Sequence, residues 1–214
     1  MPAVALCSLE DVKNILREIQ NADWNTFLIS LIAGFSGNAD VNMLGGAEGA
    51  PYNRIYTKGT YTEYFSSDGY TRKLNVKAFP IQSITGLWID TNGVWDAGTL
   101  QPANSYIADR RGGPWIHAWY TWFPYGIQHI KVTYQGGLFT TTGDVHAPLR
   151  MACATQVAFW WRNRDRLGII SEGMQGGSFT RFAKGEFLPE IKAWLAPYRN
   201  FAFSVQNSAP PGGR

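Results

Sequence analysis

The sequence is poor in the residues that mark several common classes of protein. It holds two cysteines, Cys7 and Cys153, and neither belongs to a C-x-x-C pair. A disulfide framework needs more of them, so both are predicted to be free thiols, with Cys153 buried in a helix. Only 16% of the residues are charged, against about 25% in an average domain. No apolar run approaches the roughly 18 residues of a membrane span, and no secretory signal opens the chain, so we expect no membrane and synthesis in the cytoplasm.

Histidine is almost as scarce as cysteine, and no motif assigns a catalytic group. His117, His129 and His146 are separated by 12 and 17 residues, whereas a zinc site takes roughly three or four ligands, usually with one close pair. The sequence contains neither a G-x-S-x-G motif nor a glycine-rich phosphate loop before a helix. We therefore expect no catalytic residue, no metal and no cofactor, and predict that the protein is not an enzyme.

Carboxylates leave one enzyme class open, because the two acids of a glycoside hydrolase pair in space rather than in sequence. The acids of the central region are interpreted as turn and exposed-strand residues: Glu63, Asp68, Asp90, Asp96 and Asp109. A cell-wall enzyme that uses two of them stays an alternative.

The net charge of +3 is too small to predict nucleic-acid binding, but its distribution is uneven. Residues 1–146 hold 10 Lys and Arg against 12 Asp and Glu, whereas residues 147–214 hold 9 against 4. The C-terminal part either meets an acidic partner or carries an ordinary solvated basic face.

Amphipathic spacing predicts two helices in the first 46 residues. Ser8 is placed to cap the first, and Glu10 and Asp11 suit the positive end of its dipole. The second begins after Asp23. The apolar stripes of the two helices are Leu9, Val12, Ile15, Leu16 and Ile19, then Trp24, Phe27, Leu28, Leu31, Ile32 and Phe35.

Two further helices are predicted near the C-terminus. Pro148 fits the first turn of the third, which ends at Gly168. Pro189 starts a short fourth helix that Pro197 closes. One face of the third helix is formed by Leu149, Cys153, Gln156, Val157, Trp160, Arg164 and Leu167.

Between these pairs of helices the pattern changes to the period of two that strands show. Asn92-Gly93 predicts a tight hairpin between Ile89 and Val94-Trp95, because both turn residues tolerate positive φ. The turn 110–113 is expected to join two further strands. The predicted strands are 61–64, 74–76, 84–89, 106–108, 115–119 and 130–134.

These elements predict an α+β fold: a four-helix bundle with an antiparallel β-sheet region inserted between the second and third helices, followed by an extended C-terminal tail. The expected parts are N-terminal helices in 1–46, the β region in 52–138, C-terminal helices in 144–198 and the tail 199–214.

The most unusual stretch is PWIHAWYTWFPYG, residues 114–126, which is aromatic and uncharged. On a strand Trp115 and Trp119 share one face, with Ile116 and Tyr120 opposite. A sheet with one wet side cannot bury both faces in its own core, and monomers expose apolar patches of only a few hundred Å². Core, protein interface and ligand stacking all stay open. The absence of Asp, Asn, Gln and Arg between Pro114 and Gln128 weighs against a sugar platform.

Several motifs, in this order, resemble the head-to-tail connector (adaptor) proteins of tailed bacteriophages. They are LCSLEDVKNIL, YTEYF, KAFPIQSITGLWID, IKVTYQGGL, APLRMACATQVAFWWRNRDRLGI and LPEIKAWLAPYR, and together they span most of residues 6–200. The chain departs from the family's pattern at Phe79, where a tyrosine is usual, in its long β region, and in the glycine-rich segment 44–51.

The resemblance implies a structural virion protein at the head–tail interface: a homo-oligomeric ring of about twelve copies that binds the portal protein and supports a stopper or tail-completion protein. Phage DNA would pass through the ring without sequence recognition, at head completion and at genome ejection. Subunit contacts are then expected at Trp115, Trp119, Trp122 and Phe123. Portal docking is expected at Arg199, Phe201, Phe203 and Val205, since an alternating apolar tail can add to a partner's sheet or groove.

A second function class uses the same aromatic residues. A phage tail module that binds a carbohydrate or a receptor would present the stretch 114–126 to its ligand and would bind a glycan saturably, with a change in tryptophan fluorescence.

Overall fold

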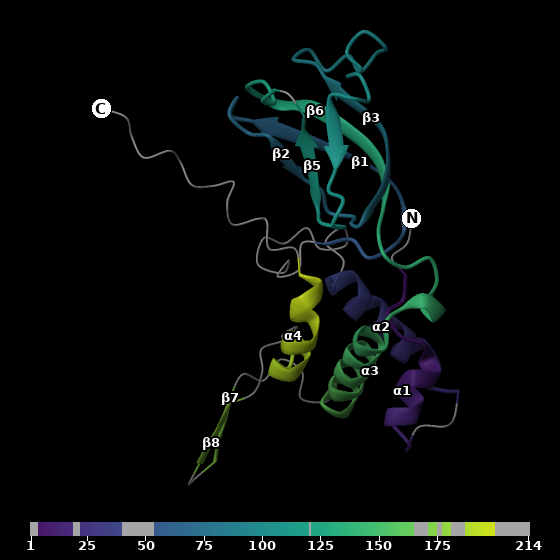
Figure 1. The fold of residues 1–214 in the computed structure, drawn as a ribbon. Helices are drawn as coiled ribbons and strands as arrows, with labels where there is room; N and C mark the ends of the chain where they lie inside the picture. Colours follow the sequence, from purple (N-terminus) through teal and green to yellow (C-terminus); the bar gives the residue numbers. More distant parts are fainter. Residues whose placement is uncertain are drawn as a thin grey trace. The chain divides into compact units, whose positions relative to one another are not determined.

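A computed structural model confirms the α+β class, with helices at both ends of the chain and strands between them (Figure 1). The chain divides into two compact units. One is built on residues 53–140, the sheet unit, and the other on residues 2–52 together with 141–199, the helical unit. The structure describes residues 4–18, 22–39, 54–119, 121–164, 171–174, 177–180 and 187–199.

The helical unit begins with α1 (Leu9–Ile15). The Ser8 hydroxyl accepts from the Asp11 amide at 3.1 Å, and the Asp11 carboxylate accepts in return from the Ser8 amide at 2.8 Å. This reciprocal capping box satisfies two backbone donors at the helix start. The helix is shorter than predicted because Leu16 has left helical geometry, with ψ 49°. Ile19 lies outside the described residues.

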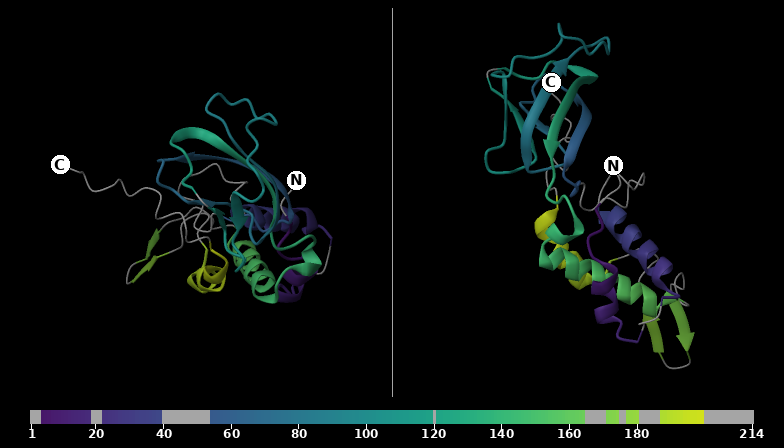
Figure 2. Two further views of the ribbon diagram at one scale, coloured as in Figure 1. Left: turned by 45° about the horizontal axis from the view of Figure 1, so that its top comes forward. Right: turned by 90° about the vertical axis from the view of Figure 1, so that its right-hand side faces the viewer.

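Helices α2 (Asn25–Ala39) and α3 (Ala147–Arg162) pack against each other and against α1 (Figures 1 and 2). Pro148 occupies the first turn of α3, as predicted. The helix ends at Arg162, before the predicted Gly168, because Asn163 leaves helical geometry with ψ 13°. The Asn163 side chain also bonds the Phe159 carbonyl at 2.9 Å. The buried side of α3 includes Leu149, Cys153, Gln156, Val157, Trp160 and Trp161.

Helix α4 (Pro189–Leu195) has the predicted bounds and leads into the 3-10 turn η4 (Ala196–Tyr198). It buries Ile191 and Leu195 and packs against α3. The same unit holds the 3-10 turn η2 (Thr142–Asp144) and an antiparallel hairpin of β7 (Ser171–Met174) and β8 (Gly177–Thr180), which the sequence did not predict.

The sheet unit contains two three-stranded antiparallel sheets rather than one continuous sheet. In the first, β6 (Gly126–Gly136) lies between β1 (Gly59–Ser67) and β3 (Ile81–Ile89) (Figure 1). In the second, β5 (Trp115–Ala118) lies between β2 (Lys73–Asn75) and β4 (Tyr106–Ala108). One apolar core joins them, and its fully buried members include Leu74, Val76, Leu87, Ile116, Ile130, Val132 and Tyr134.

The predicted hairpin at Asn92-Gly93 is wrong, although Gly93 does adopt a positive φ of 74°. The Asp90 carboxylate instead accepts from the Asn92 amide at 2.8 Å and the Val94 amide at 2.5 Å, which forms a side-chain turn. The chain rejoins β3 only at residues 99–101, where Ile89 donates to the Thr99 carbonyl. The result is a wide loop rather than a two-residue turn.

Candidate interaction surfaces

One end of the sheet unit carries a cluster of exposed aromatic side chains. The turn 67–72 and the loop 121–125 meet there, because Ser67 pairs with Gly126 and the Phe123 amide donates to the Thr71 carbonyl at 2.9 Å. Gly69, with a φ of 83°, lies against Tyr125. We call this cluster the aromatic end. Its exposed members are the aromatic residues Tyr70, Trp119, Trp122 and Tyr125 and the aliphatic residue Ile127.

Cations hold the tryptophans of this region. The Arg72 guanidinium lies 4.1 Å from the centre of the Trp122 ring, and the Lys73 ammonium lies 5.7 Å from that of Trp115. Both distances fall within the range of cation–π attraction, about 6 Å. Trp122 is therefore oriented by its own chain while about half of it, 49%, faces solvent.

The predicted subunit-contact residues separate into exposed and buried members. Trp119 and Trp122 are 51% and 49% exposed, and Trp115 is half-buried on β5. Phe123 is only 3% exposed and packs into the core of the sheet unit. Its expected role as a contact is therefore corrected: Phe123 fixes the loop, with the Ser67 hydroxyl on its carbonyl at 3.0 Å.

A second aromatic cluster lies on the first sheet. The Lys131 ammonium lies 4.9 Å from the ring centre of Trp88 and 6.0 Å from that of Trp95. The Tyr64 ring packs 5.8 Å from Trp95 and is exposed. This cluster anchors the wide loop after β3 onto the sheet.

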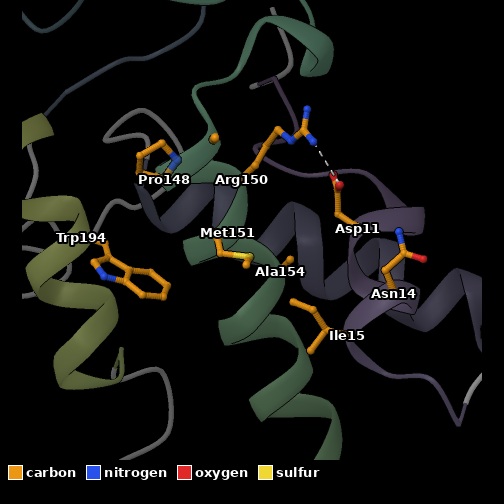
Figure 3. Close-up of a pocket in the computed structure, with 9 residues that line it drawn as sticks. Asp11, Asn14, Ile15, Pro148, Arg150, Met151, Ala154 and Trp194 are labelled. Atoms are coloured by element: carbon orange, nitrogen blue, oxygen red, sulfur yellow. Dashed lines mark hydrogen bonds and ion pairs between the residues drawn. The ribbon is translucent and has the colours of Figure 1, made fainter.

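The helical unit has a cleft of about 680 Å³ between α1, α3 and α4 (Figure 3). An ion pair between Arg150 and Asp11, 3.4 Å long, lies on its α1 side. Met151 and Trp194, 55% and 42% exposed, line it from α3 and α4. The sequence did not predict the cleft; its only signal was a large apolar side chain at these two positions, off the buried stripes of their helices.

Most of the docking residues expected in the tail lie outside the described residues. Arg199 is the last described residue and follows η4. Phe201, Phe203 and Val205 lie outside the described residues. Tyr198 bonds His146 at 3.3 Å, so the described chain ends next to the first turn of α3, whose Ala147 and Pro148 line the cleft.

The acidic residue that differs most from expectation is Glu63, predicted to be an exposed-strand residue. Its carboxylate accepts hydrogen bonds from the Tyr134 hydroxyl and from the Lys77 amide, the latter at 3.0 Å. Burial raises the pKa of Glu63 against the opposing effect of these bonds. Because the Tyr134 hydroxyl also accepts from the Ala78 amide at 3.0 Å, this network ties β1 to β6 and to the segment after β2.

Neither a metal centre nor a membrane span emerges from the described residues. Across the described ranges, no three His, Cys, Asp or Glu side chains gather where they could hold a metal ion. Every helix in that part of the chain is too short or too polar to cross a bilayer.

Comparison with solved structures finds a similar fold in chains of gene transfer agent particles. A structure described as the virion of a native gene transfer agent particle contains a chain that matches 95% of this one, over 90% of its own length, with a TM-score of 0.50 and 13% identity. A chain from the neck of that particle, computed with C12 symmetry, matches 94% of this chain over 91% of its own length, with a TM-score of 0.48 and 14% identity. No protein-family model and no curated protein matches the sequence.

Proposed function

We propose that this chain is a structural virion protein that forms an adaptor ring between the portal of a tailed-phage capsid and its stopper or tail. The observation that carries the proposal is a fold shared along 95% of the chain with a gene transfer agent virion chain. The motif order of the connector family supports the same assignment. Such a role needs surfaces rather than chemistry, and the surfaces described above supply them.

The aromatic end is the proposed lateral contact of the ring. A ring is built from heterologous contacts, in which one patch on a subunit meets a different patch on the next. Trp119 and Trp122, and the half-buried Trp115 on β5, present large rigid rings of the kind that dominates interface energies. Arg72 orients Trp122 before binding, which lowers the entropy lost on association.

The tail beginning at Arg199 is the proposed portal-docking segment, with Phe201, Phe203 and Val205 as its apolar side chains. Phage DNA would cross the ring without sequence recognition, in keeping with a net charge of only +3. A chain ended at Tyr198 should lose portal binding, and one ended at Gln206 should keep it. Portal binding by the shorter chain would refute the docking role.

Ring formation on portal rings tests the proposal directly. Replacing Trp119 and Trp122 together by serine should leave a folded monomer, because both side chains are half exposed. Loss of two aromatic anchors at about 2 kcal/mol each, about 4 kcal/mol together, should weaken each subunit contact by roughly 1,000-fold. Light scattering or native mass spectrometry would measure the loss of assembly. Tyr64→Ser, which removes an exposed aromatic ring from the first sheet, is the matched control and should assemble.

Normal assembly of the Trp119→Ser, Trp122→Ser chain would refute the lateral contact, and a wild-type chain that stays monomeric beside portal rings would refute the adaptor role. The carbohydrate-binding alternative predicts saturable quenching of Trp122 by a glycan. Arg72 already covers part of that ring, which favours a protein contact.

A further inference from the structure

The two cysteines of the chain meet inside the helical unit. The Sγ atoms of Cys7 and Cys153 lie 2.9 Å apart, although the residues are 146 positions apart in sequence. Both are free thiols, and both side chains are buried. The sequence predicted two unrelated thiols, so their contact is a feature that only the fold creates.

The surroundings hold Cys7 against α3. The Leu6 amide donates to the Ser36 hydroxyl of α2 at 3.0 Å, and that hydroxyl donates to the Ile32 carbonyl at 2.8 Å. The segment before α1 is thus fixed between α2 and α3, with Leu6 and Cys7 buried. Burial and the neighbouring Cys7 raise the pKa of the Cys153 thiol, so exchange requires a local opening of this segment.

We propose that Cys7 and Cys153 form an intrachain disulfide when the chain meets an oxidising glutathione pool. One cysteine thiolate attacks glutathione disulfide, forms a mixed disulfide and releases one glutathione. The second cysteine thiolate then attacks the protein sulfur of that mixed disulfide and releases the other. Two thiols and one glutathione disulfide become one protein disulfide and two reduced glutathiones, which balances atoms and electrons.

The bond would close a loop that contains α1, α2 and the whole sheet unit, and would fasten the N-terminal segment to α3. The two sulfurs need to approach by only roughly 0.9 Å to reach the bonded distance of about 2.05 Å. In a reducing cytoplasm the pair stays open. The inference does not depend on the proposed function; a virion protein would pass from a reducing to an oxidising environment on release.

The test is the equilibrium constant for disulfide formation in glutathione buffers, measured on the full chain in native buffer and in concentrated urea. Starting from both the reduced and the oxidised chain shows that equilibrium is reached. The free energy by which the disulfide stabilises the fold equals the free energy by which the fold favours disulfide formation. The equilibrium constant should therefore be about 30- to 1,000-fold larger in native buffer than in urea. The oxidised product should be a monomer that is lighter by two hydrogen atoms.

The melting temperature gives a second readout. Oxidation should raise the Tm of the wild-type chain by roughly 5–15 °C, and should give no such rise in Cys7→Ala or Cys153→Ala, each of which keeps one thiol. Equal constants in native buffer and in urea, or an oxidised chain that melts no higher than the reduced one, would overturn the proposal. The comparison uses wild-type protein, so it does not depend on the variants folding.

Discussion

At the scale of single residues, neighbours along the chain have opposite roles that composition does not reveal. Trp122 and Phe123 are adjacent aromatic residues, yet their environments differ. About half of Trp122 is exposed, with Arg72 over its ring, whereas Phe123 lies in the core. The sequence left core, protein interface and ligand stacking open for the aromatic stretch, and the structure buries Phe123 and exposes Trp122. The sequence could not assign each ring, because residues 121–125 run as a loop without the strand alternation on which the prediction relied.

Glu63 gives a prediction at this scale. Its pKa is raised in the folded chain, so it contributes stability below the ordinary glutamate value of 4.5, and that contribution is lost as the pH rises through the folded value. Glu63→Gln keeps the acceptor oxygen for Tyr134 and Lys77 without a charge. We expect it to be at least as stable as wild type at pH 8, with the difference shrinking toward pH 4, as measured by urea unfolding.

Glu63→Leu is the control for the hydrogen bonds themselves. It leaves the Tyr134 hydroxyl and the Lys77 amide without their acceptor and should cost about 1–3 kcal/mol at both pH values. A Glu63→Gln chain that is less stable than wild type at pH 8 by as much as Glu63→Leu would show that the carboxylate charge is stabilising, contrary to the burial argument.

At the scale of elements, the bounds of a helix were predicted correctly where residues at its ends determine them. Helix α4 has its predicted bounds because of two prolines. Pro189 is well tolerated in the first turn of the helix, and Pro197 follows its last turn. Helices α1 and α3 end earlier than predicted because the backbones of Leu16 and Asn163 leave helical geometry, which a periodicity argument does not include. The predicted hairpin does not form, because the Asp90 carboxylate bonds the Val94 amide, which a two-residue turn would pair with the Thr91 carbonyl.

The capping box of α1 gives a prediction at this scale. Ser8→Ala removes the acceptor of the Asp11 amide and should destabilise the helical unit by about 1 kcal/mol. Ser30→Ala is the matched control, because the Ser30 hydroxyl bonds only the Thr26 carbonyl on an exposed face of α2 and a mid-helix alanine is favourable. Thermal unfolding followed by circular dichroism compares the two. Equal stability of the two variants would contradict a capping role for Ser8.

At the scale of the whole molecule, the two ends of the sheet unit lie together. The first and last segments of the sheet unit meet: Thr57 bridges Phe139 in parallel, and the Lys58 amide donates to the Phe139 carbonyl at 2.7 Å. Gly137, with a φ of 107°, makes this possible, since a Cβ there would lie 2.2 Å from the Thr57 carbonyl oxygen. The sequence shows a glycine at position 137, but it does not reveal that the Thr57 backbone packs against it and leaves no room for a side chain.

A unit whose ends are joined by its own hydrogen bonds should fold when excised. We expect residues 53–140 alone to give a β-type circular dichroism spectrum, dispersed amide resonances and one cooperative unfolding transition, because the core of the two sheets lies within this range. Gly137→Val in the same fragment should unfold it, since the side chain would meet the Thr57 backbone at a positive φ. A wild-type fragment without dispersed resonances would mean that the sheets need the helical unit to fold, and the insertion would then be a feature of chain order alone.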